Sequence, residues 1–107
     1  MANLSSADVE VLRTNVRALS NGSILFEKTC RLTASVAAGT VANQIPASAF
    51  GLQTVEEVST GVKSDNTLTY TFAPSADNSQ ILNRNPATGA PADLTIGHVL
   101  YLTVRGY

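Results

Sequence analysis

The sequence predicts an all-β domain: a small antiparallel β-sandwich or barrel with one or two short helical turns. Apolar and polar residues alternate with a period of two along several stretches, which is typical of half-buried antiparallel strands. Charged residues make up only 14% of the chain, and Ser, Thr and Asn supply much of its polar character. The 107 residues suffice for one core, so residues 1–107 are expected to form a single β-rich domain.

The N-terminal segment allows two interpretations. Apolar residues within 9–19 recur with helical spacing, and Ser5 with Asp8 matches a helix-capping pattern. The Asn-Gly dipeptide at 21–22 is, however, a strong hairpin signal. We expect a short helical turn near residues 5–8, then a strand that turns back at this dipeptide. A helix that ends there is the alternative.

Residues 24–37 carry the cleanest alternation, with mostly apolar even positions and mostly polar odd positions. Fully extended, this stretch would span ~45 Å at ~3.3 Å per residue. A compact domain of this length has a radius of gyration of only ~13 Å. The strand is therefore expected either to bend strongly or to project beyond the domain body, where its apolar face would need a partner.

Phe26 and Lys28 are interface candidates on this strand. Lys28 follows Phe26 on the apolar face, and a buried lysine without a partner is costly. Either its aliphatic stem packs while the amine reaches water, or the outer half of the strand lies outside the core. In the second case Lys28 would sit at a contact between subunits.

Turns and short strands are expected from residue 43 to residue 93. Pro46 and Gly51 suit the start and end of a short helical turn. β-Branched residues in 52–62 favour a strand, with a bulge at Gly61. The remaining expectations are a turn at 63–66, a strand at 67–73, a turn at 74–79, a strand at 80–84 and a loop at 85–93. The acidic residues in turn-like stretches suit turn hydrogen bonding; they are Asp65, Asp77 and Asp93.

A last strand is predicted over residues 94–105. Its more apolar face is expected to carry Leu94, Ile96, His98, Leu100, Leu102 and Val104. The opposite face carries Val99 and Tyr101 among threonines, and is apolar enough to form a contact. Val99 and Tyr101 are therefore the second pair of interface candidates.

The sequence offers no catalytic, metal-binding or cofactor-binding residues, and we do not expect an enzyme. His98 is expected to be structural, with one hydrogen-bond partner, because one histidine and one cysteine cannot supply a zinc site. Cys30 is expected to behave as a small core residue. Glu56 and Glu57 are adjacent in a predicted strand, so they would point to opposite faces rather than share a substrate.

Charge and hydropathy also limit the partners. The formal net charge is −1, without a basic run, so nucleic acid is not an expected partner. No apolar run approaches the ~18 residues of a membrane span. The first residues lack the pattern of a signal peptide, so synthesis in a cytoplasm is expected.

Three segments, "MANLSSADVEVLR", "IPASAFGLQTVEEVSTGVKSDN" and "PADLTIGHVLYLTVRGY", together resemble small head-associated virion proteins of tailed bacteriophages, of the decoration or cement type. The likeness covers about half the chain and rests on phrases rather than on a chemical motif. It implies a structural protein, made in the host cytoplasm, that binds the major capsid protein on the capsid exterior as a homo-oligomer. The alternatives are a ligand- or glycan-binding β-module, whose candidate ring residues are Tyr70, Tyr101 and Tyr107, and a tail or fibre component.

Overall fold

The computed structural model describes residues 3–107 and confirms the all-β fold class. It contains eight strands and two short 3-10 helices, η1 and η2. The helices are η1 (Ser6–Asp8) and η2 (Ala47–Phe50). The strands are β1 (Val9–Ala18), β2 (Ile24–Thr33), β3 (Ile45–Pro46), β4 (Val55–Val58), β5 (Gly61–Lys63), β6 (Thr69–Pro74), β7 (Gln80–Arg84) and β8 (Val99–Gly106).

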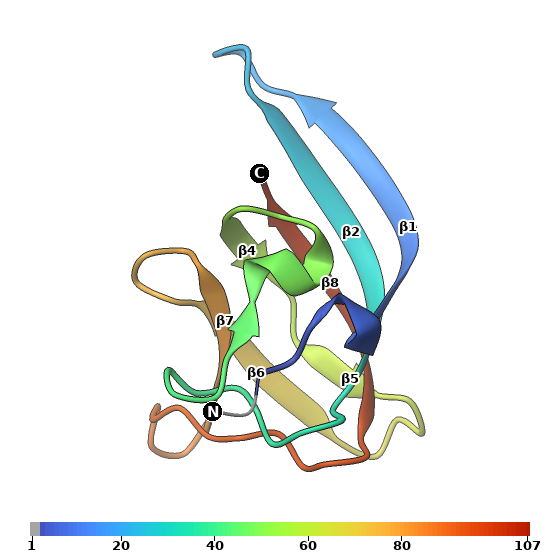
Figure 1. Cartoon of the computed structure of the whole chain (residues 1–107), viewed down its shortest axis with the longest axis vertical. Helices are drawn as coiled ribbons and strands as arrows, with labels where there is room; N and C mark the ends of the chain where they lie inside the picture. Colours follow the sequence, from blue (N-terminus) through green and yellow to red (C-terminus); the bar gives the residue numbers. More distant parts are fainter. Residues whose placement is uncertain (1–2) are drawn as a thin grey trace.

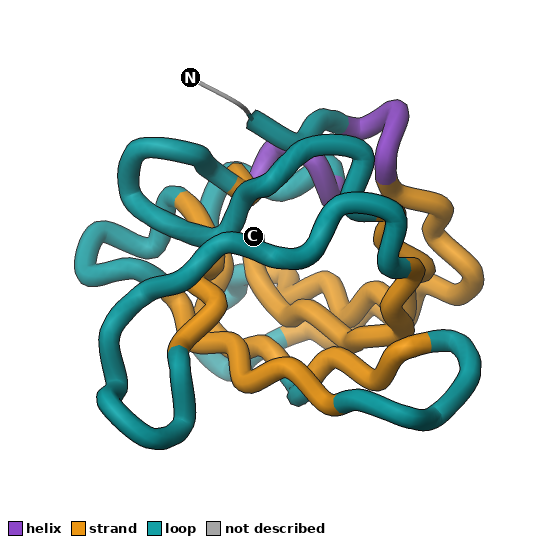
Figure 2. The backbone as a smooth tube through the Cα atoms, turned by 90° about the horizontal axis from the view of Figure 1, so that it is seen from below, coloured by secondary structure: helices purple, strands orange, loops and turns teal. Residues whose placement is uncertain are grey.

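The strands form one antiparallel sheet in the order β1-β2-β8-β5-β6-β7-β3, with β4 also paired to β8. The sheet curls into a half-barrel around the core (Figures 1 and 2). The radius of gyration is 13.1 Å and the principal extents are 38 × 27 × 25 Å. The long axis follows the β1–β2 hairpin, which rises above the rest of the molecule in Figure 1.

The structure decides between the two interpretations of the N-terminal segment. Ser5 and Asp8 form a capping box around η1, and a strand follows directly. β1 then pairs with β2 along its whole length, with a bulge between Val11 and Arg13. Leu12 is the extra residue at this bulge, and it shifts the alternation of the following side chains by one position. This shift explains why the apolar residues within 9–19 recur with helical spacing although they belong to a strand.

The strand predicted over residues 24–37 is shorter than expected, because β2 ends at Thr33. The amide of Ala34 then donates to the carbonyl of His98, and the chain bends at residues 35–36. The hairpin nevertheless projects, since β1 and β2 extend past the end of β8 (Figure 1). The predicted stretch 24–37 is therefore divided: its first part projects as β2, and the chain bends only after this strand has ended.

The prediction of a strand at 94–105 was wrong for its first five residues. β8 begins at Val99, and Gly97 has a φ of 91°, outside the extended region. Leu94 is buried whereas Ile96 is 63% exposed, so these residues do not share a face. The expected strand at 52–62 also divides into β4 and β5, because the chain steps from one end of β8 to the other.

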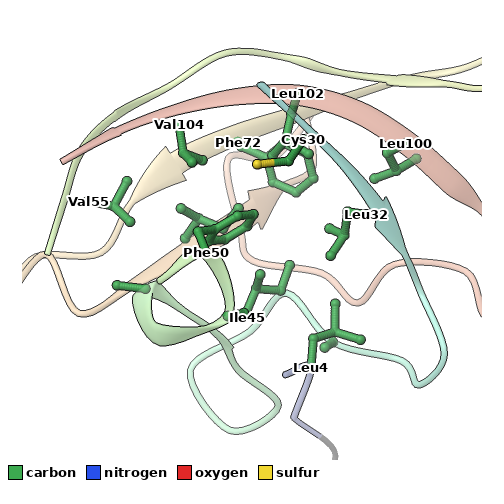
Figure 3. Packing of buried hydrophobic residues seen from close by; sticks show 14 of the residues in the cluster. Leu4, Cys30, Leu32, Ile45, Phe50, Val55, Phe72, Leu100, Leu102 and Val104 are labelled. Atoms are coloured by element: carbon green, nitrogen blue, oxygen red, sulfur yellow. The ribbon is translucent and has the colours of Figure 1, made fainter. Parts of the chain in front are cut away.

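The core lies inside the curl of the sheet and is closed by η2 and by Leu4 (Figure 3). Leu32, Leu100 and Leu102 reach it from the two central strands, and Phe50 reaches it from η2. Gly51 ends η2 with a φ of 72°, as the sequence predicted. Pro46 lies one position before the helix rather than at its first residue.

Candidate interaction surface

The four predicted interface residues lie on opposite faces of the sheet. Phe26 and Lys28 belong to the inner face, since they are paired with Gly106 and Val104 of β8. Val99 and Tyr101 alternate with the buried leucines of β8 and therefore belong to the outer face. The sheet separates the two pairs, so they cannot form one continuous surface.

Lys28 makes its contacts within the chain. Its Nζ donates a hydrogen bond of 2.7 Å to the carbonyl oxygen of Phe50, at the end of η2. The same nitrogen lies 5.9 Å from the centre of the Phe26 ring, within the range of a cation–π contact. Phe26 is half-buried and packs against the core cluster. These contacts tie the base of the projecting hairpin to the body.

Val99 and Tyr101 lie on a mainly polar outer face. Tyr101 is 40% exposed and is paired with Arg31 of β2 and Val62 of β5. Arg31 forms an ion pair with Glu10 on the neighbouring strand. The apolar area around Tyr101 is therefore small and bordered by charge.

A second charged group crosses the outer face nearer the hairpin. Arg105 donates to Glu27 at 2.5 Å and to Glu57 at 2.6 Å. The hydrogen bond from Arg105 is the main reason that the pKa of Glu27 lies below its usual value, and Asn15 adds to the effect. The same two carboxylates raise the pKa of Arg105. This network links strands β2, β4 and β8 on their solvent side.

His98 and Cys30 occupy separate structural positions. The Nδ1 of His98 lies 2.6 Å from the hydroxyl oxygen of Tyr70, which gives His98 the single partner expected of it. Cys30 is fully buried in the core, and burial raises the pKa of its thiol to about 11. Among residues 3–107, no group of three or more His, Cys, Asp and Glu side chains could hold a metal ion.

Two hairpin turns use the same local chemistry. Asp65 accepts hydrogen bonds from the amide and hydroxyl of Thr67, and Asp77 does the same for Ser79. These bonds are the main reason that the pKa of Asp65 falls to about 2 and that of Asp77 is also lowered. Both predicted turn roles are confirmed. Asp93 instead accepts longer bonds from two residues of a distant loop.

The sequence did not single out the exposed apolar side chains of the β1–β2 hairpin. We call the side of β1 that does not face β2 the β1 edge. It has no partner strand in the sheet order, and every β1 residue after Val9 is exposed. The exposed apolar side chains of the hairpin are Val11 (42%), Leu12 (48%), Val16 (62%) and Ile24 (50%). The strand predicted over 9–19 was the available signal, but the alternative interpretation of this segment as a helix concealed it.

A shallow depression lies elsewhere, between β6 and β7. Its volume is about 260 Å³, and its lining includes Leu68, Tyr70, Arg84 and Pro86. The Tyr70 hydroxyl is hydrogen-bonded to His98 and its ring stacks on Phe72 with the centres 6.3 Å apart, so the ring is held by packing. Of the other candidate rings for glycan binding, Tyr101 and Tyr107 are 40% and 38% exposed.

Comparisons with protein-family models, with curated proteins and with solved structures found no significant match. Within residues 3–107, no helix is both long and apolar enough to cross a membrane.

Proposed function

We propose that this chain is a structural protein of a phage virion, of the decoration or cement type, which stabilises the head through protein–protein contacts. The observation that carries the proposal is the projecting β1–β2 hairpin on a small, closely packed β-body. The hairpin offers an open strand edge and exposed apolar side chains, which are features of surfaces that bind other proteins. The resemblance of three segments to head-associated virion proteins supplies the viral context.

The proposed mechanism needs binding and rigidity but no chemical step. The major capsid protein is the proposed partner, contacted on the exterior of the shell. Each copy would gain little energy from one small contact, but many copies on a repeating lattice would act together where neighbouring copies are joined. The ion pairs of Arg105 with Glu27 and Glu57 join three strands of the outer face, on which such contacts could form.

Purified virions provide the direct test. Peptides of this chain should be present in intact particles at a fixed ratio to the major capsid protein. Particles stripped of the chain should release their DNA at a lower temperature, and adding the purified chain should restore the original value. Absence of the chain from purified particles would overturn the proposal. A location on the tail in a particle map would instead favour the tail or fibre alternative.

A ligand- or glycan-binding module is the second candidate, and the depression beside Tyr70 favours it. The depression combines Leu68 and Pro86 with the polar side chains of Arg84 and Asn85. Its volume of about 260 Å³ lies just below the usual range of ligand pockets. Binding on a glycan array that is lost in Arg84→Ala would support this candidate, and an array without hits would count against it.

A further inference from the structure

We infer that two copies of this chain associate through antiparallel pairing of their β1 edges, with Thr14 at the two-fold axis. The inference specifies how the proposed oligomer forms, but it concerns the isolated chain and does not require a capsid. It rests on the open edge, the faces of the β1 side chains and the order of charges along the strand. Pairing would join two curled sheets into one continuous sheet.

The β1 edge is accessible along the whole strand. β1 is the terminal strand of the sheet, and it forms the outer side of the hairpin in Figure 1. At the other end of the sheet, β3 pairs over only two residues. An unpaired edge of ten residues with exposed valines is a template for another strand. β1 is thus the long free edge of residues 3–107.

The register with β2 assigns each β1 residue to a face. Val9, Val11, Thr14, Val16 and Ala18 pair with inner-face residues of β2, whereas Glu10, Arg13, Asn15 and Arg17 pair with outer-face residues. Leu12 is the extra residue at the bulge. When Leu12 is left out of the count, four residues paired with β2 precede Thr14 and four follow it, so Thr14 is the midpoint of the paired strand. A two-fold axis perpendicular to the sheet places the inner faces of both copies on the same side of the joined sheet.

Pairing about Thr14 matches both polarity and charge. Val11 lies opposite Val16 of the second copy on the inner face, and Glu10 lies opposite Arg17 of the second copy on the outer face. Each contact occurs twice because of the symmetry. Cross-strand valine pairs and opposite charges directly across a ladder both stabilise a sheet.

The charges also select this register over its neighbours. Centring the pair on Arg13 would place Arg13 opposite Arg13 of the second copy. Centring it on Asn15 would place Arg13 opposite Arg17 of the second copy, twice. Like charges directly opposite each other are destabilising. Centres at Val11 or Val16 avoid this repulsion, but they pair only five residues of each strand, counted from the register with β2.

The groups required for the new ion pair are free to make it. Arg17 forms no ion pair with another described residue, although, besides the hydrogen bond from Arg105, its charge also helps to lower the pKa of Glu27 on the same face. Glu10 binds Arg31 through Oε2, while its Oε1 accepts no hydrogen bond from the described residues. The carboxylate can therefore keep Arg31 and accept a second guanidinium from the other copy. Three charged side chains would then alternate in sign across the interface.

Cysteine crosslinking tests the register. In Thr14→Cys, the two new thiols lie directly opposite each other, with Cβ atoms ~4.5–5.5 Å apart. A mild oxidant or a short bis-maleimide should join the copies into a covalent dimer. Ala18→Cys is the matched control on the same strand and face, since its two thiols would lie ~26 Å apart along the strands at ~3.3 Å per residue. Cys30 is buried, so the wild-type chain should not crosslink.

Charge reversal provides the second test. Arg17→Glu places Glu opposite Glu and should weaken the dimer at least tenfold in sedimentation equilibrium, while the circular dichroism spectrum stays unchanged. The double variant Glu10→Lys, Arg17→Glu should recover part of the lost affinity, because opposite charges again face each other between the copies while the new lysine also faces Arg31 within its own chain. The inference is overturned if Thr14→Cys crosslinks no better than Ala18→Cys, or if the wild-type chain sediments as a monomer at about 1 mM. A dimer insensitive to Arg17→Glu also overturns it. None of these results bears on whether the chain is found in virions.

Discussion

Replacing Lys28 with methionine separates a structural role of this residue from a role in binding a partner. The amine donates to the Phe50 carbonyl at 2.7 Å and lies 5.9 Å from the centre of the Phe26 ring. Methionine keeps the apolar stem and removes the charge and the donor. The Phe50 carbonyl, at the end of η2, then loses its hydrogen bond from the hairpin.

The size of the effect follows from these two contacts. A hydrogen bond from a charged donor contributes about 1.5–3 kcal/mol, and a partly exposed cation–π contact adds about 0.5 kcal/mol. Lys28 is half-buried, so water can replace part of what is lost. We expect the free energy of unfolding to fall by about 2 kcal/mol and the Tm to fall by roughly 10 °C.

Urea unfolding followed by circular dichroism measures this change, because the chain has no tryptophan for fluorescence. Lys63→Met is the matched control: its amine pairs with the exposed Asp65 at 3.1 Å, so the expected loss stays below about 1 kcal/mol. If Lys28→Met were as stable as the wild type but failed to assemble, the structural role would be wrong. The original prediction of a subunit contact at Lys28 would then regain support.

Three further predictions concern glycine packing and pH. Gly106→Ala should unfold at lower urea than Gly89→Ala, because a Cβ at Gly106 would overlap the Thr54 carbonyl oxygen. At Gly89 a Cβ would meet only open space, so alanine there is disfavoured by the φ of 73° alone; equal midpoints would contradict this. Cys30 should react with a thiol reagent only on unfolding. Because its folded pKa of about 11 exceeds the unfolded 9.0, stability should be full below pH 9 and fall by up to about 2–3 kcal/mol towards pH 11, a loss that Cys30→Ala should remove. The pKa values of Glu27, Asp65 and Asp77 are lowered by folding, so the stability they contribute is present above about pH 4.5 and is lost as the pH falls towards 2, which acid titration of the circular dichroism signal would detect. If Asp77→Asn lost stability at low pH in the same way as the wild type, Asp77 would not contribute to the acid sensitivity.

The fold class and many turns could be predicted because they depend on neighbouring residues. Alternation marks β2 and most of β8, since successive side chains of a strand point to opposite faces. Gly51 ends η2, and Asp65 and Asp77 close their turns, through bonds that span only a few residues. His98 and Cys30 could be assigned structural roles because the composition lacks the partners that chemistry would require.

The candidate surface was harder to predict because it depends on which strands become neighbours. Phe26 and Lys28 share the inner face, but they are held by Phe50 and the core rather than left free. Val99 and Tyr101 are placed on the other side of the sheet. The exposed residues of β1 were not selected, because the bulge at Leu12 makes a strand resemble a helix when only spacing is considered.

Short-range backbone preferences and side-chain alternation were enough to predict the β class and the turns that Asp65 and Asp77 close. The folded chain was needed to show that residues 9–18 form a strand of the hairpin at Asn21 and Gly22, that β1 lies at the end of the sheet with β8 in its middle, and that Lys28 binds the Phe50 carbonyl. Such features follow from pairing between distant residues, in which a one-residue shift moves every side chain to the other face. The open β1 edge, from which the proposed dimer derives, belongs to this second group.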